Sequence, residues 1–371
     1  MTLLDPLLDL FRGRTITVPP LDGAFRPNTR LDDAPLLAGL DAPDDMVRGT
    51  NGQVYVSSGP AVLALDVATG RTDRVATLDS PVTALAALPA GGLMAGLDDG
   101  RLIRLSEGGP PEVIAADGLA CPVAIAPRPD GRVLVAQGSA TRRPSEWARD
   151  LMERNASGTV WCVDPGRGTI RALARHLAFP LGLAIENGSH VVVAESWRHR
   201  LVRLPIEGGR ADPILTALPG YPARLSPAVG GGWWLALFAP RNRLIEFVLD
   251  EPEYRRAMLA TVPPQHWIAP ALSPAASFLD PLQCGAVRTM GVSKPWAPSR
   301  SFGLAVRLDA RFRPEASLHS RANGRRHGVT GVLDLGNRVL VAAKGAGAVL
   351  SVPNESEAID HPLSLPPRDA R

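Results

Sequence analysis

Polar side chains follow short apolar strands at several points of this chain, and Glu195 is the clearest example. Glu195 ends the run His190 to Ala194, which is almost purely apolar, as expected for a strand buried on both faces. A carboxyl group at the edge of a core can have a raised pKa and act as a general acid or base. The alternative role is a structural salt bridge with Arg198 or Arg200 of the same hairpin.

Two more residues are candidates for catalysis. Lys344 ends the apolar run VLVAAK, and a lysine in a low-dielectric channel can act as a nucleophile or base. His327 directly precedes a strand and could be a general base. Each also has a plain alternative, a solvated loop lysine and a loop histidine. The sequence contains no GxSxG motif that would supply a serine nucleophile for His327.

Arg224 is the most specific candidate for ligand binding. A guanidinium binds a carboxylate or phosphate through two parallel hydrogen bonds. The alternative is that Arg224 pairs within the protein, with Asp44 or Asp45. The other predicted substrate-binding residues, also placed near strand ends, are Asp45, Gln137, Trp197 and Arg241.

A repeated unit positions these side chains. Each copy has an apolar strand after Pro or Gly, a turn with Gly and usually Asp or Asn, and a second apolar strand ending in a small or polar residue. Copies at the spacing of one propeller blade predict a six-bladed β-propeller in a single all-β domain. The six copies begin near residues 42, 81, 121, 177, 221 and 327.

Two insertions interrupt the repeat, at about 140–156 and 239–302. The spacing of apolar and charged residues in the first insertion predicts one amphipathic helix at 145–154. The second insertion is expected to be helical in part and to continue as a Pro- and Ser-rich loop. We expect both to form a lid over the channel. We divide the chain into an N-terminal helix and ring-closing strand (1–40), the propeller (41–353) and a loosely ordered tail (354–371). The closing strand is expected within 14–30, since an open seam would expose sheet edges.

Composition narrows the function classes. The chain has 371 residues and a net charge of +3, with 40 basic and 37 acidic residues, which gives no case for a nucleic-acid partner. The N-terminus is too short and too acidic to predict a signal peptide or a membrane span. Three scattered cysteines, Cys121, Cys162 and Cys284, suit reduced, mostly buried thiols. We therefore expect a cytoplasmic protein with a small-molecule ligand.

Several stretches carry a family resemblance. FPLGLAIENGSHVVVAESWRHRLVRLPIEGG and GYPARLSPAVGGGWWLALFAPRNRLIEFV resemble signature segments of the strictosidine synthase-like family. RRPSEWARDLMERNASGTVWCVDPGRG is similar to the family's helical insertion, and GVTGVLDLGNRVLVA to its closing blade. The resemblance spans roughly residues 40–353. It implies a six-bladed propeller related to calcium-dependent lactonases and arylesterases of the paraoxonase, gluconolactonase and SMP-30 type.

The positions that the resemblance assigns to a calcium ion are substituted. They fall on Asp44 and Asp45, on Pro122 or Val123, on Leu181, and on the pair Ala223 and Arg224. Calcium needs six to eight oxygen ligands, and Leu, Ala and Arg side chains supply none. The plant enzyme after which the family is named performs a metal-free condensation with a glutamate. By resemblance, that glutamate falls near Thr330, where this sequence has no carboxylate. We therefore expect no cofactor and metal-independent chemistry.

Three functions remain open. The first, implied by the resemblance, is hydrolysis of a lactone or ester. The substituted calcium positions weaken the case for it, because no Lewis acid would polarise the carbonyl. The second is a metal-free acid–base reaction or condensation of the Pictet–Spengler kind, involving Glu195 and Arg224. The third is a non-catalytic propeller that binds a small molecule or acts as a scaffold.

Overall fold

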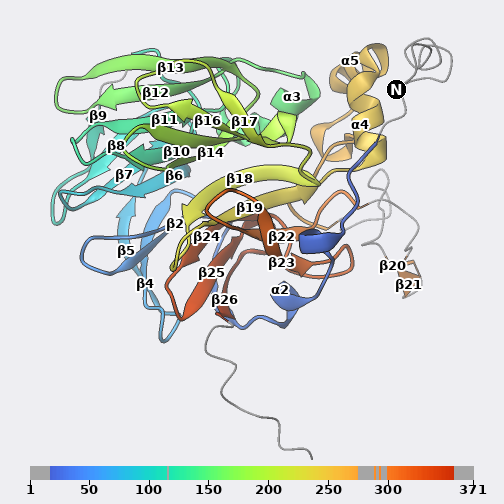
Figure 1. Ribbon diagram of the computed structural model, residues 1–371, viewed down its shortest axis with the longest axis horizontal. Helices are drawn as coiled ribbons and strands as arrows, with labels where there is room; N and C mark the ends of the chain where they lie inside the picture. The colour runs from blue at the N-terminus through green and yellow to red at the C-terminus, as the bar shows by residue number, and fades with distance from the viewer. Residues whose placement is uncertain (1–16, 115–116, 275–287, 290–291, 294–298, 355–371) are drawn as a thin grey trace, which may run out of the picture.

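The structure is a computed structural model that describes residues 17–114, 117–274, 288–289, 292–293 and 299–354. Six four-stranded antiparallel sheets form a β-propeller (Figure 1). Their first strands contact one another in a closed ring, β2 to β6, β10, β14, β18, β24 and back to β2. The predicted six-bladed propeller is confirmed.

The strand bounds follow the predicted repeat. Blades 1 and 2 comprise β2 (Pro43–Arg48), β3 (Val54–Ser58), β4 (Ala61–Leu65) and β5 (Thr72–Thr77), then β6 (Val82–Ala87), β7 (Leu93–Leu97), β8 (Leu102–Leu105) and β9 (Glu112–Ile114). Blades 3 and 4 comprise β10 (Pro122–Pro127), β11 (Val133–Gln137), β12 (Gly158–Asp164) and β13 (Thr169–Leu177), then β14 (Pro180–Ile185), β15 (His190–Glu195), β16 (Arg200–Pro205) and β17 (Asp212–Leu215). Blades 5 and 6 comprise β18 (Gly220–Pro227), β19 (Trp233–Pro240), β22 (Gly303–Leu308) and β23 (Pro314–Ser320), then β24 (Val329–Asp334), β25 (Arg338–Ala343), β26 (Ala348–Pro353) and β1 (Leu36–Gly39).

Burial decreases from the channel outward, which explains the residue types along each blade. Every residue of β7 and β11 is buried, and both strands are almost wholly apolar. The fourth strand of blade 1, β5, has no buried residue and the polar sequence TDRVAT. Second strands packed between two neighbouring blades therefore need continuous apolar runs, whereas an outer strand can be polar. Cys121 and Cys162 are buried free thiols, and Cys284 lies outside the described residues.

The ring closes through the N-terminal segment, but not where the sequence predicted. The fourth strand of blade 6 is β1 at Leu36–Gly39, paired with β26, rather than a strand within 14–30. Pro19, Pro20 and Pro27 cannot donate ladder hydrogen bonds, so this segment is poorly suited to a sheet. Its described part, residues 17–30, runs along β23, where the Asn28 side chain forms hydrogen bonds with the backbone of blade 5.

Shorter elements complete the described chain. The N-terminal segment carries η1 (Gly23–Phe25) and α2 (Arg30–Asp33). The first insertion forms η2 (Pro144–Glu146) and α3 (Trp147–Met152), close to the predicted helix. The second forms α4 (Arg243–Asp250), α5 (Pro252–Thr261), η4 (Pro264–His266), β20 (Arg288–Thr289) and β21 (Val292–Ser293). Single turns η3 (Ser196–Arg198) and η5 (Lys344–Ala346) follow β15 and β25. The predicted helix at the start of the chain and the tail after residue 354 lie outside the described residues.

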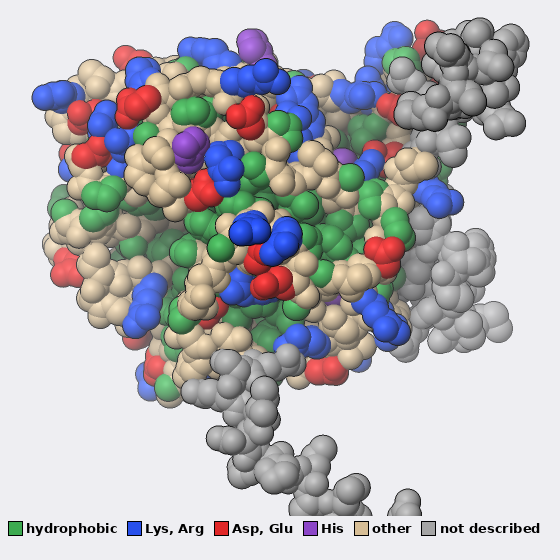
Figure 2. Space-filling view, viewed as in Figure 1, with side chains coloured by type: hydrophobic (Ala, Val, Ile, Leu, Met, Phe, Trp, Pro, Cys, Tyr) green, Lys and Arg blue, Asp and Glu red, His purple; other side chains and the backbone are tan. Residues whose placement is uncertain are grey.

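The helical insertions lie together at one side of the propeller. In Figure 1, α4 and α5 stand beside α3, and α5 contacts both of the other helices. On the face shown in Figure 2, basic and acidic side chains are interspersed and no large patch of one sign is present among the described residues. Within the described part of the chain, no helix has the length and apolar character needed to cross a bilayer.

Candidate functional site

Arg224 lies buried where the inner strands of the propeller meet. Its Nη1 donates to Oδ1 of Asp44 at 2.7 Å, and its Nε lies 2.9 Å from Oδ2 of Asp45. Burial alone would lower the pKa of the guanidinium, but the two carboxylates outweigh burial and raise it. Arg224 therefore pairs with Asp44 and Asp45 inside the protein, which was one of the two roles that the sequence left open for it.

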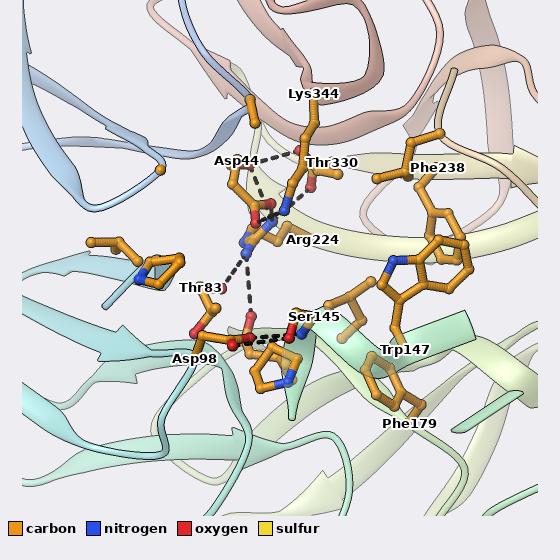
Figure 3. A pocket seen from close by; sticks show the side chains of 18 of the residues that line it. Asp44, Thr83, Asp98, Ser145, Trp147, Phe179, Arg224, Phe238, Thr330 and Lys344 are labelled. Carbon is orange, nitrogen blue, oxygen red and sulfur yellow. Dashed lines mark hydrogen bonds and ion pairs between the residues drawn. The ribbon is translucent and has the colours of Figure 1, made fainter. Parts of the chain in front are cut away.

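Backbone carbonyls complete the surroundings of Arg224. Its Nη2 donates to the carbonyl oxygens of Thr83 at 2.6 Å and Val123 at 3.4 Å. Its Nη1 also reaches the carbonyl oxygens of Asp44 at 3.1 Å and Thr330 at 3.4 Å. One side chain from blade 5 thus contacts blades 1, 2, 3 and 6, as Figure 3 shows for the labelled residues.

Asp44 links Arg224 to Lys344. Oδ2 of Asp44 accepts a hydrogen bond of 2.6 Å from Nζ of Lys344, while Oδ1 binds Arg224. Burial raises the pKa of Asp44, but Arg224 and Lys344 together outweigh burial and lower the pKa to about 2. Asp44 is therefore ionised at neutral pH and holds the Lys344 ammonium group at the rim of the channel.

The pKa of Asp45, the second carboxylate beside Arg224, shifts in the opposite direction to that of Asp44. Its carboxylate accepts hydrogen bonds from the backbone amides of Met46 and Leu85, both at 2.9 Å. Burial nevertheless raises the pKa of Asp45, because the lost hydration outweighs the attraction of Arg224. Asp45 thus pairs with Arg224 inside the protein and does not line the central cavity.

A cavity of about 370 Å³ opens above Arg224. One side is polar, formed by Asp44, Thr83, Asp98, Ser145, Thr330 and Lys344 around the guanidinium. The apolar part of the lining includes Trp147, Phe179, Leu181, Trp197, Phe238 and Leu272. Figure 3 shows the aromatic side chains of Trp147 and Phe238 to one side of Lys344 and Arg224. A concave apolar site with a few placed polar groups is the usual form of a small-molecule pocket.

The first insertion is fixed to this cavity by two hydrogen-bonded anchors. Asp98, directly after β7, accepts hydrogen bonds from the backbone amide and hydroxyl of Ser145, at 2.7 and 2.9 Å. Buried Asp150 of α3 accepts a hydrogen bond of 2.7 Å from Nε1 of Trp197. Trp197 in turn stacks on Phe179 with ring centroids 4.5 Å apart. Both insertions contribute to the wall, since Trp147 comes from the first and Leu272 from the second.

Glu195 and Gln137 lie away from the cavity. Glu195 is fully buried and accepts hydrogen bonds of 2.6 Å from both Arg198 and Arg200. Gln137 accepts hydrogen bonds from the amide of Ala120 and the indole of Trp161. Each is the last residue of a second strand, whereas cavity-lining Asp98 and Lys344 stand one position beyond theirs. Since alternate positions of a strand face opposite sides, that single step separates the two groups.

His327 and Arg241 are also engaged elsewhere. His327 is fully buried, with Nδ1 2.8 Å from the Ser301 hydroxyl and Nε2 donating to the carbonyl of Arg321 at 2.8 Å. Burial lowers the pKa of His327. Arg241 binds Glu246 through two hydrogen bonds of 3.1 Å. Of the predicted site residues, the cavity lining therefore includes Lys344, Trp197 and Arg224, with Asp45 behind it, while catalytic roles for Glu195 and His327 stay predictions.

Sequence reasoning missed several residues of the cavity. Asp98 follows β7 as Lys344 follows β25, so comparison of strand ends between copies could have found it. Thr83 contributes a backbone carbonyl, which its side-chain type does not reveal. Trp147 and Phe238 occur in the insertion and in an apolar strand, and only the folded arrangement shows that they face one cavity.

A calcium ion does not fit the channel position. The Arg224 guanidinium already occupies the space between Asp44 and Asp45, and Leu181 lines the cavity without an oxygen ligand. Across the described ranges, no three His, Cys, Asp or Glu side chains are grouped to share a metal ion. These residues therefore do not form the calcium site that the resemblance implies.

Curated sequences similar to this chain match it over about a third of their length, and no family model matches it. Strictosidine synthase-like 6 of Arabidopsis thaliana is 26% identical over 136 residues, which is 36% of this chain and 37% of that protein. Adipocyte plasma membrane-associated protein of Mus musculus is 28% identical over 129 residues, 31% of each protein. These matches confirm the resemblance to strictosidine synthase-like proteins at the family level.

Solved structures share the propeller over nearly the whole chain. A putative gluconolactonase superposes with a TM-score of 0.54 and 15% identity, covering 86% of this chain and 91% of that one. Regucalcin of Agrobacterium tumefaciens, a calcium-binding protein, gives 0.53 and 14%, covering 86% and 92%. At these identities the likeness establishes the fold.

Proposed function

We propose that this chain binds a small, mainly apolar organic molecule in the central channel, with Lys344 as its polar anchor and without a metal ion. The cavity of about 370 Å³, with aromatic side chains facing the Lys344 ammonium group, carries the proposal. Apolar burial would supply most of the binding free energy, and the few polar groups would orient the ligand.

Lys344 suits the anchoring role because its ammonium group is only partly used. Nζ can donate three hydrogen bonds, and it donates one to Asp44. Its side chain is 31% exposed at the cavity, so the remaining N–H groups can reach a ligand oxygen. A carbonyl or carboxylate oxygen of the ligand is the matching acceptor.

Binding accounts for the cavity better than hydrolysis does. Attack by water on a lactone or ester needs a general base near the carbonyl. Asp44 is held by two cations and has a pKa of about 2, which makes it a weak base. Both carboxylate oxygens of Asp98 already accept hydrogen bonds from Ser145. The acid–base reaction suggested for Glu195 has no support from geometry either, since that side chain is absent from the cavity lining.

A thermal-shift screen tests the proposal with a panel of aromatic and aliphatic carboxylates, lactones and aryl esters. We expect a binder at 100 times its Kd to raise the Tm of the wild-type protein by roughly 3 °C. Leu181→Trp, which fills the cavity, should abolish the shift, and Lys344→Met should reduce it. Val229→Trp, on the exposed surface, is the matched control and should leave it unchanged.

Two results would count against binding as the function. A shift that persists fully in Leu181→Trp would place the ligand outside the channel. Turnover of a lactone or ester by the wild-type protein, lost in Leu181→Trp, would instead favour the hydrolase predicted by resemblance. The same panel, followed by product analysis, separates these outcomes.

A further inference from the structure

We propose that the Arg224 guanidinium is a tethered cation filling an ion site built from carboxylate and backbone carbonyl oxygens, and that removing it creates a site for a free guanidinium ion. The site surrounds Arg224 among the inner strands, and its existence does not depend on the identity of the ligand that binds in the cavity. It rests on the oxygens around Arg224 and on the strand irregularities that present them.

The oxygens around Arg224 come from both side chains and backbone. The carboxylates of Asp44 and Asp45 approach to 2.7 and 2.9 Å. Carbonyl oxygens of Thr83 and Asp44 lie at 2.6 and 3.1 Å, and those of Val123 and Thr330 both lie at 3.4 Å. Carboxylate and carbonyl oxygens converging from separate strands are the donor set of a cation site.

A β-bulge accompanies every inner strand at the same level, and this is an independent sign of a built site. The pairing register shifts across the residues that contact the guanidinium. These shifts lie at 43–46 in β2, 82–84 in β6, 122–124 in β10, 222–225 in β18 and 329–331 in β24, with a sixth at 180–182 in β14. A bulged residue leaves the regular ladder, so its carbonyl is free to face the channel. The ring therefore offers oxygens to a cation regardless of the side chains at those positions.

The arrangement matches a planar organic cation better than a spherical metal ion. A guanidinium presents five N–H donors in one plane, and here they reach oxygens of four blades besides its own. Calcium would require its oxygens at 2.3–2.6 Å from one centre. Positive charge is also needed in the site, because Asp44 is ionised and Lys344 reaches only one of its oxygens.

Chemical rescue of Arg224→Ala tests the inference. Breaking a buried ion pair should lower the Tm by roughly 5 °C. We expect low-millimolar guanidinium chloride to restore at least half of that loss, while sodium chloride at equal ionic strength restores none. Arg203→Ala is the matched control, because Arg203 binds Glu186 through two hydrogen bonds of 2.7 Å on the surface. Neither Arg203→Ala nor the wild-type protein should be stabilised by guanidinium.

Each alternative result bears on the inference. Equal stabilisation of Arg224→Ala and Arg203→Ala, or none of Arg224→Ala, would overturn it. Stabilisation by calcium chloride and not by guanidinium would also overturn it, since the site would then suit a spherical ion. If Arg224→Ala does not fold, Arg224→Lys and Arg224→Gln decide. The charged lysine variant should keep a clearly higher Tm than the neutral glutamine variant, and the reverse order would contradict a cation site.

Discussion

Replacing Asp44 by Asn tests how much the central carboxylate stabilises the fold. In the folded protein its pKa falls from 3.8 to about 2, because Arg224 and Lys344 outweigh burial. Since one pKa unit corresponds to about 1.4 kcal/mol, the ionised carboxylate contributes roughly 2 to 3 kcal/mol at neutral pH. Asn keeps the shape but not the charge, so Asp44→Asn should lower the free energy of unfolding by about that amount, or somewhat more because Arg224 loses a partner.

The pH dependence distinguishes charge from shape. A carboxyl group whose pKa is depressed on folding stabilises the protein fully above its unfolded pKa of 3.8. That stabilisation is lost as the pH falls through the folded value of about 2. The difference between wild type and Asp44→Asn should therefore be constant from pH 7 to pH 5 and should fall by about half at pH 3.

Urea unfolding followed by circular dichroism at pH 7, 5, 4 and 3 measures this difference. Asp212→Asn removes an exposed carboxylate, with 72% of the side chain accessible, and should change the free energy of unfolding very little. A loss for Asp44→Asn that is the same at pH 7 and pH 3 would refute the reasoning, because it would come from packing and not from charge.

Three more outcomes are expected. Asp98→Ala should speed backbone hydrogen exchange at 144–152, because Asp98 anchors Ser145; exchange as slow as in the wild-type protein would count against this anchor. Burial, then Arg321, lowers the pKa of His319 from 6.5 to about 4, so stability present above pH 6.5 should be lost as the pH falls through 4. Urea unfolding should show a smaller loss in His319→Gln, and an equal loss would exclude His319 as its source. Gly182→Ala should lower the Tm strongly, since a Cβ there would lie 2.2 Å from the carbonyl oxygen of Ala223, whereas Gly188→Ala, with open space around it, should not.

The fold was predictable because every blade repeats one local pattern. Apolar second strands such as His190–Glu195 must be buried on both faces, and their regular recurrence defines the ring. The closing strand was misplaced because the sequence of Leu36–Gly39 carries only four residues and no turn motif of its own. Its place depends on pairing with β26, which lies more than 300 positions away in the chain.

The candidate site was predictable only in part. The pairing of Arg224 with Asp44 joins residues 180 positions apart, so the sequence could offer it but not decide it. Glu195 is the last residue of β15 and is enclosed between Arg198 and Arg200, whereas Lys344 follows the last residue of β25 and reaches the cavity. A displacement of one residue reverses the facing side, which composition and motif cannot reveal. The carbonyls around Arg224 depend on bulges, which leave no signature in side-chain types.

Equilibrium dialysis against calcium chloride, followed by elemental analysis of the wild-type protein, shows whether Arg224 replaces a bound metal ion. The guanidinium of Arg224 lies between Asp44 and Asp45, at the position that the resemblance assigns to a calcium ion. We therefore expect the dialysed protein to retain no stoichiometric calcium and its Tm to be unchanged by a chelator. One tightly held calcium ion per chain, with a Tm that falls on chelation, would contradict it.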